Sequence, residues 1–545
     1  MPILRFLFVC LEVVLLFNLM ILVHELGHFL AARWRGLVVE KFGIWFGKPI
    51  WKKTIGGVEY SLGSIPAGGF VALPQMAPME VMEGRTDTPR EMLPPISALD
   101  KIIVAIAGPL FSVLLAVIFA FVVWGVGRPV AEGEKTTRIG YVELNSPADK
   151  AGLRPGDKIL SVNGKPVERF GGMDKSVSWN VISSEGNTIP FVVERDGQKL
   201  TLTSTFEKEK KEFWERKGFR QVGISPAQTP LIAKIIDGSF AARAGFKPND
   251  FITAVDGQKI YSPEGIDLYL EQNPKTTVQL TVQRGHETLQ LPLTIDGLPV
   301  AGVVNNGPAE VAGIRAGDVI TAINGKPAVS RTSLSKSVRN SPGQIITFTI
   351  RRGTETRDVK LKPARPDSPK SFTDPVVGVQ WQPDALGGIT WDLSGRLQIA
   401  HPTPWEQIKA ASTTLFNTLG AVLSPKSDVG LQHLSGPAGI GRIYYILLQN
   451  EYGWQAALWF SVVLNINLAI MNMLPIPVLD GGHITLALVE AARKRPVNVR
   501  ILERIQSACA FLIIGFMLYV TFFDAQDFFG RRTIKFERPV PAVTQ

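Results

Sequence analysis

The chain contains a five-residue motif, His24-Glu25-Leu26-Gly27-His28, whose side chains have the types and spacing of a metal site. Residues four apart on a helix share one face, so the two imidazoles can bind one ion together. Histidines at this spacing are typical zinc ligands, and the glutamate between them is placed to act as a general base on a zinc-bound water. The alternative interpretation is a polar helix end at a membrane surface, since a motif this short also arises by chance.

A catalytic zinc ion needs a third protein ligand, and Asp480 near the other end of the chain is the candidate. It follows Pro475 and Pro477, which exclude a regular helix and interrupt an apolar segment. Non-helical backbone at membrane depth is tolerated where it lines a cavity, and a cavity would admit water. His483 is a competing ligand, for which we favour a supporting role. A second alternative is that Asp480 only forms a turn.

Four apolar runs are long enough to span a membrane: residues 3–23, 102–126, 456–474 and 508–523. The first run ends at the histidine motif and not at a cleavage site, which favours a retained transmembrane helix over a signal peptide. Glu12 in this run is more simply explained by helix packing than by catalysis.

Composition and charge narrow the class of protein. Hydrophobic residues make up 45% of the 545 residues and charged residues only 19%, which indicates a globular protein with membrane segments. Cys10 and Cys509 both fall in apolar runs, so neither a disulfide framework nor a cysteine metal site is expected. The net charge of +10 is dispersed, with clusters beside apolar runs. This pattern favours a lipid bilayer over nucleic acid as the partner.

The positive clusters also set the expected orientation. Residues 31–53 and 491–504 are rich in Lys and Arg, which places both loops on the cytoplasmic side and residues 127–450 outside the cytoplasm. Short β-prone runs over residues 38–73 predict hairpins at the membrane face. An exposed hairpin edge there either holds a substrate as an added strand or is purely structural. Residues 74–100, rich in Pro, Met and acidic residues, predict a loop.

The central part of the chain contains a repeat. Three copies of a short helix, a glycine turn, a strand and an Asn-Gly or Asp-Gly turn lie within residues 146–164, 244–257 and 307–325. They resemble PDZ domains in their bacterial form. PDZ domains can bind a peptide as an added strand, but bulky units can also act as a plug over a membrane site, and the sequence leaves both open. Residues 404–423 predict an amphipathic helix on the membrane.

Taken together, the two motifs and the repeats resemble the site-2 protease family, in its M50-type form that regulates sigma-E through anti-sigma factors. The resemblance implies that His24, His28 and Asp480 bind Zn²⁺ and that Glu25 is catalytic. It links Asn472, Pro475, Gly68 and Gly69 more weakly to substrate binding. The better-known bacterial members look like two-PDZ proteins, whereas this chain shows three units.

The predicted fold is therefore a membrane protein with four transmembrane α-helices, a membrane-associated β-hairpin region and three extracytoplasmic α+β PDZ-like domains. The predicted ranges are 1–126 for the first membrane part, 130–206, 221–297 and 298–364 for the PDZ-like domains, 365–450 for the connector with the amphipathic helix, 451–530 for the second membrane part, and 531–545 for a tail.

The implied function is intramembrane zinc proteolysis, the hydrolysis of a peptide bond in a transmembrane segment during regulated intramembrane proteolysis. Expected substrates are a single-span anti-sigma factor already cut by another protease, or signal-peptide remnants. The expected location is the bacterial inner membrane, with the active site toward the cytoplasm. The rival hypotheses are a non-catalytic membrane adaptor that presents three PDZ units, and a zinc protein of transport or sensing.

Overall fold

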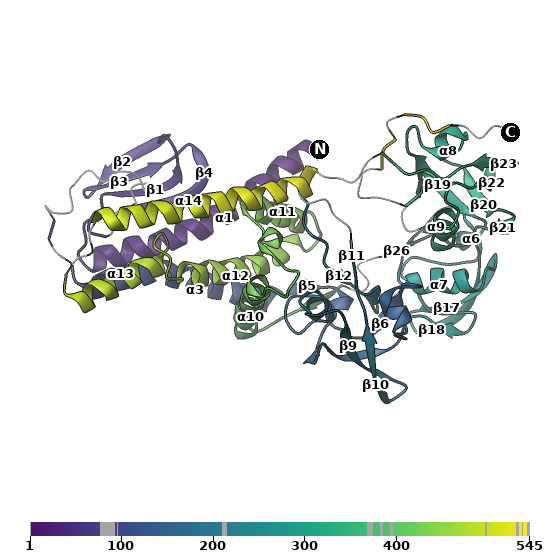
Figure 1. The fold of residues 1–545 in the computed structure, drawn as a ribbon, viewed down its shortest axis with the longest axis horizontal. Coiled ribbons are helices and arrows are strands. Elements are labelled where there is room, and N and C mark those ends of the chain that lie inside the picture. The colour runs from purple at the N-terminus through teal and green to yellow at the C-terminus, as the bar shows by residue number, and fades with distance from the viewer. Residues whose placement is uncertain are drawn as a thin grey trace. The chain divides into compact units, whose positions relative to one another are not determined.

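The computed structural model describes residues 2–76, 93–94, 96–209, 215–367, 374–381, 385–392, 397–495, 497, 499–529, 534–536 and 538–541. Most of the predicted loop 74–100, namely residues 77–92 and 95, lies outside the described residues, and so does part of the predicted tail 531–545. The chain forms two compact units (Figure 1). The helical unit contains Met1–Pro129, Ile399–Leu423 and Gly430–Gln526, and the repeat-bearing unit contains Val130–Gln398, Ser424–Val429 and Asp527–Gln545.

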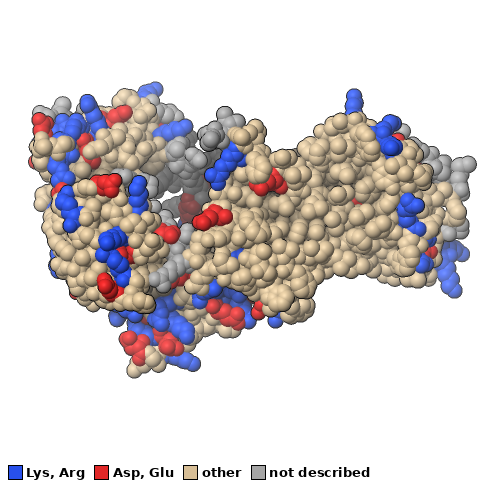
Figure 2. All heavy atoms as spheres, turned by 180° about the vertical axis from the view of Figure 1, so that it is seen from behind, with Lys and Arg blue, Asp and Glu red and all other residues tan. Residues whose placement is uncertain are grey.

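Four helices in the described part of the chain are long and apolar enough to cross a membrane, as predicted. They are α1 (Pro2–Trp34), α3 (Ala98–Val126), α12 (Gly453–Asn472) and α14 (Val499–Phe529). The first and last helices are longer than their apolar runs, because polar residues such as His24 and Arg500 continue a helix without breaking it. The face of the helical unit seen in Figure 2 is accordingly a broad surface with few charged side chains.

The α3 helix lies at the centre of the helical unit, where α1, α12 and α13 (Asp480–Arg493) pack against it. Pro109 lies inside this helix without ending it. The remaining helices are α10 (Pro404–Leu423), which coincides with the predicted amphipathic helix, η3 (Leu431–His433) and α11 (Pro437–Leu448). One buried core joins five of these helices through Met20, Ala116, Ala411, Tyr444 and Ile466.

A four-stranded sheet occupies the region where hairpins were predicted. Its strands are β1 (Lys41–Phe46), β2 (Trp51–Ile55), β3 (Val58–Leu62) and β4 (Ile65–Ala72), in the order β2-β3-β1-β4. The β1 strand pairs parallel with β3 and antiparallel with β4, so β4 is an edge strand. The indole of Trp45 donates to Asn18 Oδ1 at 2.6 Å and thereby links the sheet to α1.

The chain passes into the repeat-bearing unit through β5 (Arg128–Val130) and returns through β27 (Gln398–Ala400). Between them lie η2 (Glu132–Glu134) and three repeat units, each with its own hydrophobic core. The first repeat unit contains β6 (Ile139–Val142), α4 (Pro147–Lys150), β7 (Lys158–Val162), β8 (Lys165–Pro166), α5 (Val177–Ile182), β9 (Ile189–Arg195), β10 (Gln198–Ser204), β11 (Glu207–Lys208), β12 (Arg220–Gln221) and β13 (Ile224–Pro226).

The second and third repeat units have the same order of elements. The second contains β14 (Ile232–Ile235), α6 (Phe240–Arg243), β15 (Phe251–Val255), β16 (Gln258–Lys259), α7 (Glu264–Gln272), β17 (Thr277–Arg284) and β18 (Glu287–Thr294). The third contains β19 (Leu298–Val303), α8 (Pro308–Val311), β20 (Val319–Ile323), β21 (Lys326–Pro327), α9 (Arg331–Arg339), β22 (Ile346–Arg352), β23 (Glu355–Leu361) and β24 (Val379–Trp381). Two further strands, β25 (Ala385–Leu386) and β26 (Ile389–Trp391), follow.

Strand pairing shows that the third repeat unit is inserted within the second. The first strand of each unit pairs with a later closing strand: β6 with β13, β19 with β24, and β14 with β26. The strand that closes the second unit therefore follows the whole third unit in sequence. Each closing strand is preceded by a glycine with positive φ whose carbonyl accepts from the first half of its unit; these are Gly223, Gly378 and Gly388. The closing strands β24 and β26 lie outside the predicted ranges 221–297 and 298–364.

Candidate metal centre

Three side chains from the two ends of the chain meet in the helical unit. His24 and His28 lie on α1, and Asp480 is the first residue of α13. The Nε2 atom of His24 lies 3.3 Å from Asp480 Oδ2, and the Nε2 atom of His28 lies 3.3 Å from Asp480 Oδ1. The two Nε2 atoms are also 3.3 Å apart. These three groups, brought together because α1 and α13 both pack on α3, form the predicted triad.

The α3 helix fixes the orientation of both imidazole rings. His28 Nδ1 donates to the carbonyl oxygen of Val104 at 2.8 Å, and a carbonyl can only accept. Ser112 Oγ, 2.9 Å from Nδ1 of His24, is placed to accept the hydrogen of that ring. With the hydrogens on Nδ1, both Nε2 atoms turn their lone pairs toward Asp480, which is the arrangement that metal-binding histidines adopt.

These donor atoms fit a zinc ion. Two imidazole lone pairs and a carboxylate face one another without a hydrogen between them, and Asp480 Oδ2 is buried with no hydrogen-bond partner among the described residues. Such an arrangement is repulsive unless a cation occupies the centre. Tetrahedral zinc with bonds of about 2.0–2.1 Å holds its ligand atoms about 3.3 Å apart, which matches the three separations observed. Among the described residues, His24, His28 and Asp480 form a group of three side chains that could bind a metal ion.

Glycines make room for the triad. A Cβ atom on Gly108 would lie 2.1 Å from His28 Nε2, so only glycine leaves space for that ring against α3. A Cβ on Gly27 would lie 2.4 Å from the carbonyl oxygen of Ala107, so the same helices approach closely on the other side of the motif. On α13, a Cβ on Gly481 would lie 2.3 Å from the carbonyl of Met473, which shows how tightly the chain turns back to place Asp480.

The triad lies at a cavity of about 230 Å³, which is also lined by the polar side chains of Glu25, Asn472 and His483. Glu25 lines this cavity, and its Cγ would lie 3.1 Å from a Cβ on Gly69, so the β4 strand passes directly beside the glutamate. Asn472 lines it as well, with Nδ2 3.3 Å from His24 Nε2. His483 contributes to the wall but lies outside the three-atom group.

The remaining sequence-predicted residues lie farther from the centre. Gly68 has a φ of +81°, and a Cβ there would collide with the ring of Phe46 at 1.9 Å, so it shapes the strand next to the cavity. Pro475 is exposed in the turn between α12 and α13 and is not among the described residues that line the cavity. The sequence did not predict Ser112 or Gly108 as residues of this site. The signal that could have indicated them was a serine and a Gly-Pro pair inside an apolar run.

Comparisons with known proteins identify the family of this chain. A family model described as Peptidase family M50 matches residues 12–516. A relative from Neisseria meningitidis, whose name proposes a zinc metalloprotease, is 28% identical over 513 residues, covering 93% of this chain and 97% of the relative. A relative from Haemophilus influenzae named regulator of sigma E protease is 27% identical over 530 residues, covering 92% and 94%.

Among solved structures, the PDZ domain of an SdrC-like protein from Listeria monocytogenes matches 16% of this chain and 90% of its own length, with 24% identity and a TM-score of 0.15.

The predictions of a metalloprotease and of zinc are confirmed by the family match and the two relatives. Because the family model spans nearly the whole sequence, the chain belongs to peptidase family M50 and is a zinc metalloprotease.

Proposed function

We propose that the cavity at His24, His28 and Asp480 hydrolyses a peptide bond in the transmembrane segment of a membrane protein, with Glu25 as the catalytic residue. The observation that carries this proposal is the convergence of three ligand atoms, 3.3 Å apart. Two belong to α1, a helix of membrane-spanning length, and the third to the start of α13, which packs on the spanning helix α3. The cavity also contains one further carboxylate, that of Glu25, on the same helix as the two histidines.

The chain's own residues account for the proton transfers. Zinc, when bound by the two histidines and Asp480, makes a water molecule more acidic and polarises the carbonyl of the scissile bond. Glu25 accepts the proton of that water and then returns it to the leaving amine. Val104 and Ser112 keep the imidazoles in the ligand orientation during both proton transfers. Their contacts are to the Nδ1 atoms, which face away from the centre of the site.

The β4 strand supports binding of the substrate in an extended form. A transmembrane helix shields its own carbonyl groups, so the segment must unwind locally before attack. An edge strand can pair with such a segment through main-chain hydrogen bonds, and β4 is an edge strand whose Gly69 lines the cavity beside Glu25. Asn472 is placed to hold the same segment from the opposite helix, and Gly68 keeps the strand in its bent path. A role of Pro475 in substrate binding has less support, because this residue is exposed in the adjoining turn.

The location and partners extend the same proposal. The Lys- and Arg-rich loops 31–53 and 491–504 support a multi-pass protein of the bacterial inner membrane with its active site toward the cytoplasm and its repeat units outside. The name of the Haemophilus influenzae relative supports an anti-sigma-factor-like substrate. We propose that this substrate has a single span and is already cut by another protease. Signal-peptide remnants are the second substrate class.

The repeat units would select among such substrates. In the first unit, a cavity of about 320 Å³ lies between α5 and the segment from Arg220 to Ser225 and is wide enough to accept side chains of an added peptide strand. This supports peptide binding, the first of the two roles that the sequence left open. Exclusion of bulky extracytoplasmic domains is the second, and it requires no occupied groove.

The test compares two glutamates of one helix. Glu25→Gln is expected to lower cleavage of a membrane-embedded, single-span substrate by at least about 10³-fold, because general base catalysis is lost, while zinc content stays at the wild-type value. Glu12→Gln removes another α1 carboxylate and is expected to leave cleavage unchanged. Wild-type cleavage by Glu25→Gln would refute the assigned role. Purified protein without stoichiometric zinc would instead favour the adaptor hypothesis.

A further inference from the structure

A short segment between α10 and η3 belongs to the repeat-bearing unit. The chain leaves the helical unit after Leu423, contributes Ser424–Val429 to the repeat-bearing unit, and re-enters the helical unit at Gly430. We call Ser424–Val429 the strap. The activity described above makes no use of this segment.

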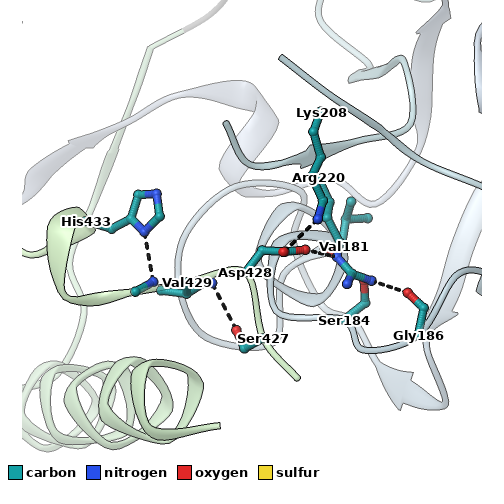
Figure 3. A network of polar contacts seen from close by, with 10 residues as sticks. Val181, Ser184, Gly186, Lys208, Arg220, Ser427, Asp428, Val429 and His433 are labelled. Carbon is teal, nitrogen blue, oxygen red and sulfur yellow. Dashed lines mark hydrogen bonds and ion pairs between the residues drawn. The ribbon is translucent and has the colours of Figure 1, made fainter. Parts of the chain in front are cut away.

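The strap is held by a carboxylate between two cations of the first repeat unit (Figure 3). Arg220 Nε donates to Asp428 Oδ2 at 2.5 Å, and Lys208 Nζ donates to Asp428 Oδ1 at 2.6 Å. The two cations come from the paired strands β11 and β12. Ser424 Oγ adds a contact at the other end of the strap by donating to Glu185 Oε1 at 2.8 Å.

Arg220 is positioned by the repeat unit itself. With the strap in place, its side chain is only 6% exposed. It donates to the carbonyl of Gly186 at 2.7 Å and lies 4.1 Å over the ring of Phe206. None of these contacts involves the strap. A guanidinium buried in this way is costly without a carboxylate partner, so the repeat unit has a site built for an anion.

Charge supports the same assignment for Asp428. Partial burial raises its pKa, but the hydrogen bonds from Lys208 and Arg220 outweigh burial and hold the pKa below its usual value. The carboxyl is therefore ionised at neutral pH and offsets one of the two positive charges of the site. Lys208 also lies 5.3 Å over the Phe206 ring, so one aromatic ring organises both cations.

We propose that Arg220 and Lys208 form a carboxylate-binding site of the first repeat unit, that Asp428 of the strap occupies it in the resting chain, and that a peptide aspartate in trans can take its place. A peptide that presents an aspartate fits because the site offers a fixed guanidinium and an ammonium to one carboxylate. Exchange would free the residues that connect α10 to η3.

The test measures binding of a labelled peptide with the strap sequence Ser-Pro-Lys-Ser-Asp-Val to the full-length protein in detergent, by fluorescence anisotropy. A tethered segment competes at an effective concentration in the millimolar range. Asp428→Asn weakens that competitor, so this variant is expected to bind the peptide at least about tenfold more tightly than wild type. Adding Lys208→Gln to Asp428→Asn should remove most of this gain. A peptide with Asn in place of Asp should not bind.

A matched control uses another ion pair of the same repeat unit. Glu168→Gln removes a carboxylate that pairs with Lys175 at the surface, and it is expected to leave peptide binding as in wild type. Equal binding by wild type and folded Asp428→Asn would overturn the proposal. Should Asp428→Asn fail to fold, hydrogen exchange of residues 424–429 in wild type decides: saturating peptide should accelerate it, and unchanged exchange would overturn the proposal.

Discussion

Two aspartates, Asp480 of the helical unit and Asp250 of the repeat-bearing unit, have opposite surroundings. In the helical unit, Asp480 faces two imidazole nitrogens, and its Oδ2 receives no hydrogen bond from the described part of the chain. In the second repeat unit, Asp250 is fully buried, and its two carboxylate oxygens accept from the guanidinium of Arg284 at 2.7 Å. The amide of Lys247 donates to the same carboxylate at 2.8 Å.

The arrangement at Asp250 recurs in each repeat unit. An aspartate after the glycine turn holds an arginine of a later strand, and that arginine also donates to the carbonyl of a turn glycine. The pairs are Asp157 with Arg195, Asp250 with Arg284, and Asp318 with Arg352. A carboxylate whose acceptors are all satisfied by its own unit stabilises the fold, whereas one that faces only lone pairs is arranged for an ion from outside.

The largest effect that tests this comparison is expected at Asp480. Asp480→Asn exchanges a carboxylate ligand for a weaker neutral one, so zinc should be lost from the purified protein and cleavage should fall by at least about 10³-fold. The unfolding temperature of the metal-free protein should not fall, because the repulsion among the three acceptors is reduced. Zinc analysis, a cleavage assay and a thermal melt measure the three quantities. Destabilisation with retained zinc would make Asp480 a structural residue like Asp250.

The opposite pattern is expected at Asp250. Asp250→Asn removes the charge that holds Arg284, and breaking one side of such a pair costs about 3 kcal/mol of unfolding free energy in the repeat-bearing unit. Zinc content should remain at the wild-type value. Protease sensitivity of the second repeat unit in the full chain, followed against temperature, measures the loss. A loss of zinc with unchanged stability would contradict the distinction between the two aspartates.

A smaller effect on stability is expected when the whole third repeat unit is removed. The third repeat unit starts after Thr294 and ends before Ala385, and its ends adjoin, since a Cβ on Gly387 would lie 3.1 Å from the carbonyl of Thr294. Replacing residues 297–381 by a short Gly-Ser linker should therefore leave the second unit folded with its closing strand β26, and zinc content unchanged. Deleting residues 385–391 instead should unfold the second unit. If both deletions unfold it, the second unit depends on the third for its stability, and the local aspartate–arginine pair is not sufficient to hold it.

How much of this could be predicted from sequence depended on distance along the chain. The proposed ligands His24 and His28 are four residues apart, so helix geometry alone brings them together. The prolines and glycines around Asp480 were the signal for the third proposed ligand. Ser112, the Val104 carbonyl and Gly108 act across the contact between two helices, which no local pattern encodes. The copies of the repeat were visible in the sequence, but not which closing strand belonged to which copy, because strand pairing is long-range.

The smallest effect concerns a third kind of aspartate, one whose neighbours are mainly other acids. Burial raises the pKa of Asp267 on α7 to about 6; nearby Arg331 opposes this, and Glu264 and Glu271 add to it. Because this value lies above the 3.8 of the model compound, the folded chain binds the proton more tightly than the unfolded chain. The contribution of Asp267 to the stability of the repeat-bearing unit should therefore become more favourable as the pH falls from 7 toward 4. Asp267→Asn should melt at a higher temperature than wild type at pH 8 and at a similar temperature near pH 4. An equal difference at both pH values would show that Asp267 acts by packing and not by charge.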